Sequence, residues 1–233
     1  MPEKQLVSTI MNCYNGEKYL KDALDSVLAQ TYENWELIFW DNQSTDNSSN
    51  IVISYNDHRI KYFYSKTHTL LYKARNLAIE ESQGGYLAFL DVDDYWDPTK
   101  LEKQMLVFEK NSKVAIVYSN YSYKNEIKNT FKKLQNNKLP EGMIIDKLLR
   151  NNFMSLLTVL LNRKFINENE NIFDERFNCI GDYDMAIRIS SKWEVSCVKQ
   201  SLATYRWHGG NESISHHELN IKELEIWSKE MII

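Results

Sequence analysis

Cysteine is scarce in this chain of 233 residues, which holds three: Cys13, Cys179 and Cys197. They lie far apart and form no CxxC pair, so the sequence argues against a disulfide framework and against a zinc cluster. A reducing compartment is favoured, because free thiols persist there.

Long apolar runs are also missing. No stretch approaches the roughly 20 apolar residues that span a bilayer, and no basic segment followed by an apolar run opens the chain. These absences predict a cytoplasmic location, with the inner face of the membrane as the place for any peripheral contact.

The chain lacks an excess of charge of one sign. Its formal net charge is -4 with 26% charged residues, and the basic residues are spread out, so we expect no nucleic-acid partner. The glycine-rich loops GxGxxG and GxxxxGK[ST] are absent, which excludes the usual dinucleotide and triphosphate loops. The EF-hand pattern is absent as well. An anionic substrate would need local positive charge or a metal ion.

Apolar runs that alternate with helical stripes fill the first half of the chain, which indicates βαβ units and an α/β fold with a mainly parallel sheet flanked by helices. Asn15 and the pair Asp97-Pro98 are expected to cap two of the helices. Strands are predicted at 6–11, 35–40, 60–65 and 86–91, and helices at 15–30, 44–56, 73–82 and from residue 97 onward.

The second half shows a weaker pattern. We predict a loop or edge hairpin at 130–140, a helix at 146–152, a strand at 157–162 and a helix at 181–193. Residues 213–233 are predicted to form an amphipathic helix. Its apolar face would comprise Leu219, Leu224, Trp227 and Met231.

Polar clusters follow three of the predicted strands, at 12–15, 41–46 and 91–94. Ligands of parallel α/β sheets bind beyond the carboxyl ends of the strands, so these clusters should meet at one site. Asp91 and Asp93 are oxygen ligands of the kind that suit Mg²⁺ or Mn²⁺. Asp94 and Asp97 could instead cap the next helix, and the residue chemistry alone leaves both readings open.

Two stretches, "STIMNCYNGEKYLKDALDSVLAQTYENWELIFWDNQSTDNS" and "ARNLAIEESQGGYLAFLDVDD", resemble the nucleotide-sugar-binding half of family 2 glycosyltransferases. These are inverting enzymes of the GT-A fold, a Rossmann-like architecture. The likeness runs over about the first 120 residues and returns at "IGDYDMAIRI" and "YRWHGGNES". It implies a nucleotide-sugar-binding half at 1–120, a smaller acceptor-binding and catalytic half at 121–212, and a C-terminal helix at 213–233 that could lead into further chain.

The resemblance also implies roles on the donor side. Tyr14 would stack on the base and Asn12 would line its edge. Asp41 would accept a hydrogen bond from the base, and Arg75 would face the base or the diphosphate. Structural alternatives are packing of Tyr14 on the first helix, capping of the turn at Ser44 by Asp41, and a surface ion pair for Arg75.

The reacting end would be built from acidic residues and one histidine. Asp91 would reach the ribose or a metal-bound water, and Asp93 would bind the metal that bridges the phosphates. His208 would contact the metal or the diphosphate, with a purely structural histidine as the alternative. Asp182 would be the general base, with Asp184 as its rival.

The sequence departs from the family pattern at three places: Asn12 stands near the usual proline, "DNQSTD" replaces "DDGSTD", and Gly181 replaces a frequent glutamate. The implied function is Mn²⁺- or Mg²⁺-dependent inverting transfer of a hexosyl or N-acetylhexosaminyl group. The donor would be a nucleoside-diphosphate sugar, by family preference a UDP-sugar, and the acceptor a hydroxyl of a glycan or glycolipid. The alternative is a non-catalytic nucleotide-sugar-binding module of a larger bifunctional protein. A sugar-phosphate nucleotidylyltransferase is disfavoured, because "NCYNGEKY" stands where such enzymes carry a glycine-rich loop.

Overall fold

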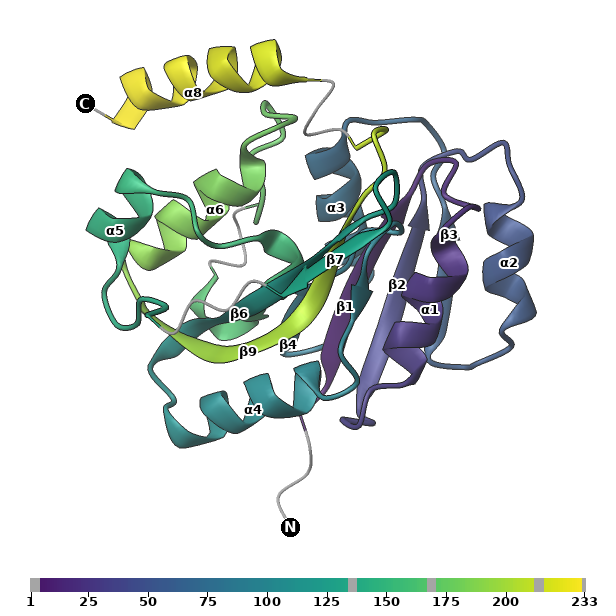
Figure 1. Cartoon of the computed structure of the whole chain (residues 1–233), viewed down its shortest axis with the longest axis horizontal. Helices are drawn as coiled ribbons and strands as arrows, with labels where there is room; N and C mark the ends of the chain where they lie inside the picture. Colours follow the sequence, from purple (N-terminus) through teal and green to yellow (C-terminus); the bar gives the residue numbers. More distant parts are fainter. Residues whose placement is uncertain (1–4, 134–137, 167–170, 212–215, 232–233) are drawn as a thin grey trace.

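Parallel strands separated by helices build the first half of the chain in the computed structural model, which describes residues 5–133, 138–166, 171–211 and 216–231 (Figure 1). Strands β1, β2, β3 and β4 pair side by side in the order β3-β2-β1-β4, all parallel, as the sequence predicts. The elements are β1 (Val7–Cys13), α1 (Leu20–Leu28), β2 (Trp35–Asp41), α2 (Ser48–Ser54), β3 (Ile60–Tyr64), α3 (Leu71–Glu80) and β4 (Tyr86–Phe89).

The second half extends the same sheet. Its order continues as β4-β8-β6-β9-β5, with β7 paired to β6. Strand β8 is antiparallel to both neighbours, whereas the long pair β6–β9 is parallel. The elements are β5 (Tyr95–Trp96), α4 (Lys100–Lys110), β6 (Val114–Asn125), β7 (Thr130–Lys133), α5 (Ile145–Arg150), β8 (Leu160–Asn162), α6 (Gly181–Ser190), β9 (Glu194–Trp207) and α8 (His217–Met231), with short 3-10 turns at Leu156–Thr158 and Arg163–Phe165.

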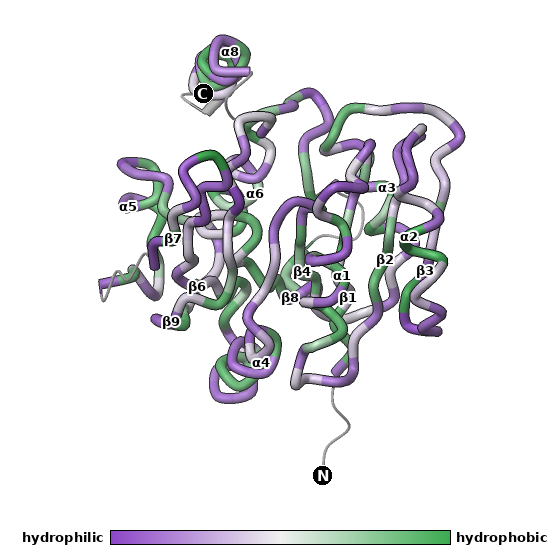
Figure 2. Tube along the Cα trace, turned by 45° about the vertical axis from the view of Figure 1, so that its right-hand side comes forward, coloured by the Kyte–Doolittle hydropathy of each residue, from purple (hydrophilic) through white to green (hydrophobic). Residues whose placement is uncertain are grey.

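Two apolar cores cover the two faces of the sheet. Helices α3, α5 and α6 contribute to one core, and α1, α2 and α4 contribute to the other. Neighbouring strand residues alternate between them: Ile10 and Ile38 lie in the first core, and Met11 and Leu37 in the second. Figure 2 shows hydrophobic stretches in the central strands β2 and β4. A sheet covered on both faces leaves its strand ends as the place for a site.

Two predicted helix caps are wrong. Helix α1 begins well after Asn15, which has φ 54° and accepts the Thr45 N–H on its side-chain oxygen at 2.8 Å. Helix α4 begins after the Asp97-Pro98 pair, and Asp97 instead accepts the Thr99 N–H at 2.9 Å in the preceding turn. Both side chains accept N–H groups of loops, so they shape loops instead of capping helices.

The predicted elements of the second half are partly confirmed. Helices α5 and α6 lie where the sequence predicts them, although α6 ends before Trp193, which is 40% exposed. The predicted strand at 157–162 is shorter, because a 3-10 turn occupies its first residues. The predicted hairpin is present as β6–β7, with residues 134–137 outside the described part. The full lengths of β6 and β9 and the short β5 are not anticipated by the sequence pattern.

Helix α8 confirms the predicted C-terminal helix but not its inward face. Trp227 is buried as expected, whereas Leu224 is 37% exposed and the charged Glu223 is buried instead. The Met231 side chain and residues 213–215 and 232–233 lie outside the described residues. Among the described helices, none combines the length and apolar character needed to cross a bilayer.

Lys100 is fully buried in α4, with its ammonium 2.8 Å from Gln104 Oε1 and 4.2 Å from the centre of the Trp96 ring. Burial lowers the pKa of Lys100 to about 7. Since the unfolded lysine keeps its ordinary pKa, the unfolded state binds more protons and stability rises with pH.

We expect the wild-type protein to gain about 2–3 kcal/mol of stability relative to Lys100→Met between pH 6 and pH 9. The reason is that the buried Lys100 is charged in the folded protein at pH 6 but neutral at pH 9. Urea unfolding of both proteins at several pH values measures this difference. Parallel pH profiles for the two proteins would contradict it.

Candidate active site

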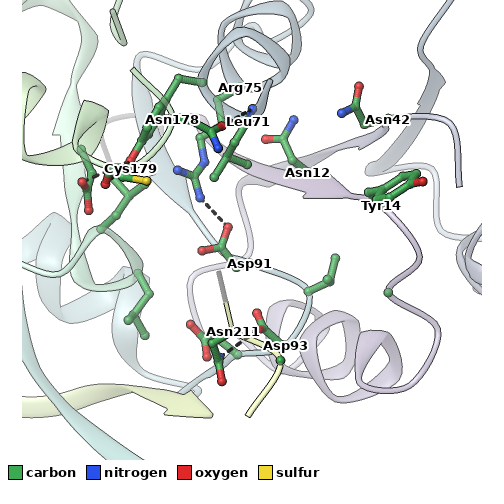
Figure 3. A pocket seen from close by; sticks show the side chains of 18 of the residues that line it. Asn12, Tyr14, Asn42, Leu71, Arg75, Asp91, Asp93, Asn178, Cys179 and Asn211 are labelled. Carbon is green, nitrogen blue, oxygen red and sulfur yellow. Dashed lines mark hydrogen bonds and ion pairs between the residues drawn. The ribbon is translucent and has the colours of Figure 1, made fainter. Parts of the chain in front are cut away.

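A cavity of about 800 Å³ lies beyond the ends of the first strands, where the loops after β1, β2 and β4 meet α3, α6 and the segment after β9 (Figure 3). Its size is that of a small-molecule site. Seven of the eight residues predicted from the sequence line it: Asn12, Tyr14, Arg75, Asp91, Asp93, Asp182 and His208.

Asn12 and Tyr14 form the wall beyond β1. Both amide atoms of Asn12, Oδ1 and Nδ2, are buried and have no hydrogen-bond partner among the described residues. The Tyr14 ring is 56% exposed and stands edge-on to His68, with ring centres 4.5 Å apart. An unpaired buried amide costs about 1–3 kcal/mol, so Asn12 is suited to a polar ligand. The open Tyr14 ring offers a stacking surface.

Asp41 is the predicted residue that does not line the cavity. It is fully buried at the end of β2, where its Oδ1 accepts the Ser44 N–H at 2.7 Å and its Oδ2 accepts the Tyr62 hydroxyl at 2.8 Å. Asp41 therefore caps the turn at Ser44, one of the two alternatives that the sequence left open. Contact between Asp41 and a base stays a prediction, and it requires the carboxylate to become accessible when a ligand binds.

Arg75 points from α3 toward the loop after β4, and its Nη2 lies 2.6 Å from Asp91 Oδ1 (Figure 3). Arg75 is only 5% exposed, so a surface ion pair is excluded. Burial disfavours its charge, but the nearby Asp91 outweighs burial and raises the pKa of Arg75. The Arg75 guanidinium is therefore a fixed positive charge beside the acidic residues of the site.

Asp93 and His208 approach each other from loops 115 residues apart in the chain. Asp93 Oδ2 lies 3.0 Å from His208 Nε2 and 3.3 Å from Asn211 Nδ2. Burial is the main reason why the pKa of Asp93 is raised; Asp91 adds to the rise and His208 opposes it. Asn211 also accepts the His208 N–H at 2.9 Å, so it orients the pair, a role that the sequence pattern did not reveal.

The pair fits a divalent cation. Asp93 Oδ2 and His208 Nε2 lie 3.0 Å apart, within hydrogen-bond distance of each other, and a carboxylate oxygen and an imidazole nitrogen are both ligand types of divalent cations. Within the described ranges, no group of three or more His, Cys, Asp or Glu residues could hold a metal. The chain would thus supply Asp93 and His208 as ligands, and water and phosphate oxygens would supply the others.

Asp94 does not cap a helix, contrary to one reading of the sequence. It is buried, and its Oδ1 accepts the Arg206 N–H from β9 at 2.8 Å. Arg206 in turn donates from Nε to the Asp93 carbonyl at 2.9 Å. These two bonds tie the acidic loop to the strand that leads to His208, which explains how residues so distant in sequence are brought together.

Asp182 lies in the first turn of α6, half-buried in the cavity wall. Its Oδ1 accepts the Tyr183 N–H at 2.8 Å and the Tyr72 hydroxyl at 3.2 Å. Burial raises the pKa of Asp182, while Arg75 opposes the rise. A carboxylate with a raised pKa is suited to general-base catalysis near neutral pH.

Asp184, the rival base, is already engaged in structural contacts. It is buried outside the cavity lining, with Oδ2 2.7 Å from Arg188 Nε and Oδ1 3.0 Å from Trp227 Nε1. The geometry therefore favours Asp182 as the residue able to reach a substrate.

Glu223 of α8 is a further residue that the sequence pattern missed. Its carboxylate accepts the N–H groups of Asn178, Cys179 and Ile180 at 2.7, 2.8 and 3.2 Å. These N–H groups directly precede α6, so Glu223 fixes the start of the helix that carries Asp182. A negative charge at this end of a helix is favourable.

The model of the family described as glycosyl transferase family 2 matches residues 8–170. The chain belongs to this family and is a glycosyltransferase. It is 34% identical over 220 residues to the E. coli protein named UDP-Glc:alpha-D-GlcNAc-diphosphoundecaprenol beta-1,3-glucosyltransferase WfgD, covering 94% of this chain and 83% of that one. It is 37% identical over 163 residues to the putative teichuronic acid biosynthesis glycosyltransferase TuaG of Bacillus subtilis, covering 69% and 64%.

Solved structures confirm the GT-A type of fold. S. aureus TarS 1-349 in complex with UDP-GlcNAc superposes with a TM-score of 0.72 at 20% identity, over 90% of this chain and 60% of that one. The mannosyltransferase PcManGT from Pyrobaculum calidifontis, in complex with GDP-Man and Mn²⁺, gives a TM-score of 0.67 at 13% identity over 88% and 57%. At these identities the likeness establishes the fold alone.

Proposed function

We propose that this glycosyltransferase moves a hexose or N-acetylhexosamine from a UDP-sugar to a hydroxyl of a glycan or lipid-linked acceptor, with a divalent cation and with inversion. The observation that carries the proposal is the cavity that unites the Asp93–His208 pair with the Asp182 carboxylate. Support for the donor and acceptor classes comes from the names of the relatives: WfgD acts on UDP-Glc and a diphosphoundecaprenol-linked sugar, and TarS binds UDP-GlcNAc.

On the donor side, the exposed Tyr14 ring stacks on the base, and the unpaired Asn12 amide binds its polar edge. Arg75 supplies the positive charge for the diphosphate and orients Asp91 toward the ribose or a metal-bound water. Asp41 supports this wall through Ser44 and contacts the base once it is accessible.

Asp93 and His208 hold the cation, Mn²⁺ or Mg²⁺. Such an ion, when bound, neutralises the negative charge that develops on the departing nucleoside diphosphate. Asn211 helps to hold the pair in place, because its side chain donates to the Asp93 carboxylate and accepts the backbone N–H of His208. Without a cation, the carboxylates gathered here would repel a diphosphate.

Asp182 is the general base. Its Oδ1 already accepts two hydrogen bonds, and no donor among the described residues binds Oδ2, which is therefore the oxygen that takes the proton. As the acceptor hydroxyl loses its proton to Asp182, its oxygen attacks the anomeric carbon from the face opposite the phosphate. The bond between that carbon and the phosphate oxygen breaks, and its electron pair leaves with the nucleoside diphosphate. One displacement inverts the anomeric centre.

The regional division belongs to the same proposal. Residues 1–120 bind the nucleotide sugar, residues 121–212 build the acceptor side, and the helix within 213–233 braces the base through Glu223. His208 and Asn211 nevertheless serve the donor end, because β9 returns to the acidic loop. A lipid-linked acceptor would place the protein in the cytoplasm against the inner membrane face, as a peripheral contact.

The proposal is tested by a thermal-shift panel of nucleotide sugars with Mn²⁺. We expect UDP-sugars to raise the melting temperature more than GDP- or ADP-sugars, because a ligand of the native state stabilises it by mass action. Equal shifts for all bases would contradict the UDP assignment. Slow Mn²⁺-dependent release of free sugar from the best donor separates an enzyme from a module that only binds.

A further inference from the structure

Tyr72 fills the wall of the cavity between α3 and the start of α6. Only 3% of it is exposed, and its ring stacks on Phe173 with centres 5.2 Å apart. The Arg75 guanidinium carbon lies 5.3 Å from the ring centre. At the far end of the ring, the hydroxyl lies 3.2 Å from Asp182 Oδ1 and 3.4 Å from the Cys179 carbonyl oxygen. The ring is thus fixed by packing, and its hydroxyl reaches the candidate base.

The Tyr72 hydroxyl acts as a donor. Burial, reinforced by the charge of Asp182, raises the pKa of Tyr72 well above its usual range, so the phenol keeps its proton. The Tyr183 N–H binds the same oxygen of Asp182 from the other side. Two donors on Oδ1 fix the plane of the carboxylate and leave Oδ2 for a substrate.

The lack of a side chain at Gly181 leaves room for the Tyr72 ring. A Cβ at position 181 would lie 2.6 Å from the Tyr72 Cδ2 atom and 2.7 Å from two further ring atoms. Such distances are far inside van der Waals contact, and the ring cannot easily retreat because Phe173 lies against it. Position 181 does not have a positive φ, so space rather than backbone conformation requires glycine there. The glutamate frequent in the family could not occupy this position beside Tyr72.

We propose that Tyr72 is the positioning residue of Asp182 and that Gly181 is present to admit it, an inference that rests on the proposed role of Asp182 as the base. The tyrosine hydroxyl orients the Asp182 carboxylate, and the absence of a side chain at Gly181 leaves room for the tyrosine ring. Tyr72 does not touch the reacting atoms.

The hydrogen bond from the Tyr72 hydroxyl should have a measurable effect on the proton affinity of Asp182. The charged groups that face its carboxylate are Arg75 from α3, which stabilises the ionised form, and Asp91 from the loop after β4, which opposes it. His216, before α8, lines the same cavity. The Tyr72 hydroxyl is a neutral side-chain donor to this carboxylate, and removing a donor from a carboxylate increases the affinity of the carboxylate for protons.

The test is a titration of the ¹³C-labelled aspartate carboxyl groups of the full chain by NMR, with the Asp182 signal identified by its loss in Asp182→Asn. We expect Tyr72→Phe to raise the proton affinity of Asp182 about three- to tenfold, because the ring remains and only the hydroxyl is lost. The matched control is Tyr183→Phe, whose ring packs on Trp227 and which binds Asp182 only through its backbone. This control should leave the titration unchanged. An unchanged titration in Tyr72→Phe would overturn the proposal.

A second set of variants tests the glycine. We expect Gly181→Ala to displace the ring and raise the proton affinity of Asp182 as Tyr72→Phe does, so the double variant should add little to either single change. Gly85→Ala is the control, because a Cβ there has no atom within 4 Å. Additive effects of Gly181→Ala and Tyr72→Phe would mean that the two residues act separately and would overturn the coupling.

The titration needs no substrate, so it tests the positioning role of Tyr72 separately from the role of Asp182 as the base. If Asp182→Asn lacks transfer activity while Tyr72→Phe titrates as wild type, the positioning role fails and the base remains. If Asp182→Asn transfers sugar at the wild-type rate, the base itself is wrong, whatever the titration shows.

Discussion

Asp182→Asn is expected to lower the rate of sugar transfer by about 10²–10⁴-fold, the usual contribution of a general base. Affinity for the nucleoside diphosphate should stay near the wild-type value, because the Asn12 amide, Tyr14 ring and Asp93–His208 pair are untouched. Initial transfer rates measure the first effect, with the best donor of the thermal-shift panel. Isothermal titration with UDP and Mn²⁺ measures the second.

The matched control is Asp184→Asn, two residues further along α6. Its carboxylate holds Arg188 and Trp227, so we expect a lower melting temperature with transfer retained per folded molecule. The reverse result, a rate that falls with Asp184→Asn and persists with Asp182→Asn, would assign the base to Asp184.

Asp93→Asn is expected to remove the effect of the cation on nucleotide affinity. In the wild-type protein, UDP should bind at least about tenfold more tightly with Mn²⁺ than with a chelator, because an ion held by Asp93 and His208 would neutralise the negative charge of the phosphates. In the variant, which has one carboxylate fewer beside His208, the two affinities should converge. Isothermal titration under both conditions gives this ratio directly.

Asp97→Asn is the control for that experiment, since it changes an exposed carboxylate of the same acidic stretch that binds only within its own turn. It should preserve the full effect of Mn²⁺. Equal affinities with and without Mn²⁺ in the wild type would remove the cation from the proposed mechanism.

The alternation of apolar strands and helical stripes was sufficient to predict the first half of the fold. It failed for β6 and β9, because the second half of each strand mixes polar and aromatic side chains, as in "VYSNYSYKN". Their pairing joins residues about 80 positions apart, which a local pattern does not show. The same limit explains α8: Glu223 is buried because three N–H groups from a distant segment bind it, whereas a charged residue in a helix is usually solvated.

The sequence predicted which residues belong to the candidate site, but it did not predict the contacts between them. Seven of the eight residues that the resemblance to the family indicated line the cavity. The resemblance did not indicate that the Asp41 carboxylate accepts the Tyr62 hydroxyl, nor that Asn211 binds the Asp93–His208 pair. The sequence does not single out Tyr72 either: it stands just before the helix predicted at 73–82, and only its hydroxyl contact with Asp182 in the structure indicates a further role.

The contacts of α8 have a practical consequence for any shortened form of this protein. A chain cut before His217 would lose the one carboxylate that accepts the N–H groups of residues 178–180, together with the indole that binds Asp184. Deletion of this terminal helix would therefore loosen the turn that carries Asp182, although the helix is far from that turn in the chain, and would also take Asn220 out of the cavity wall.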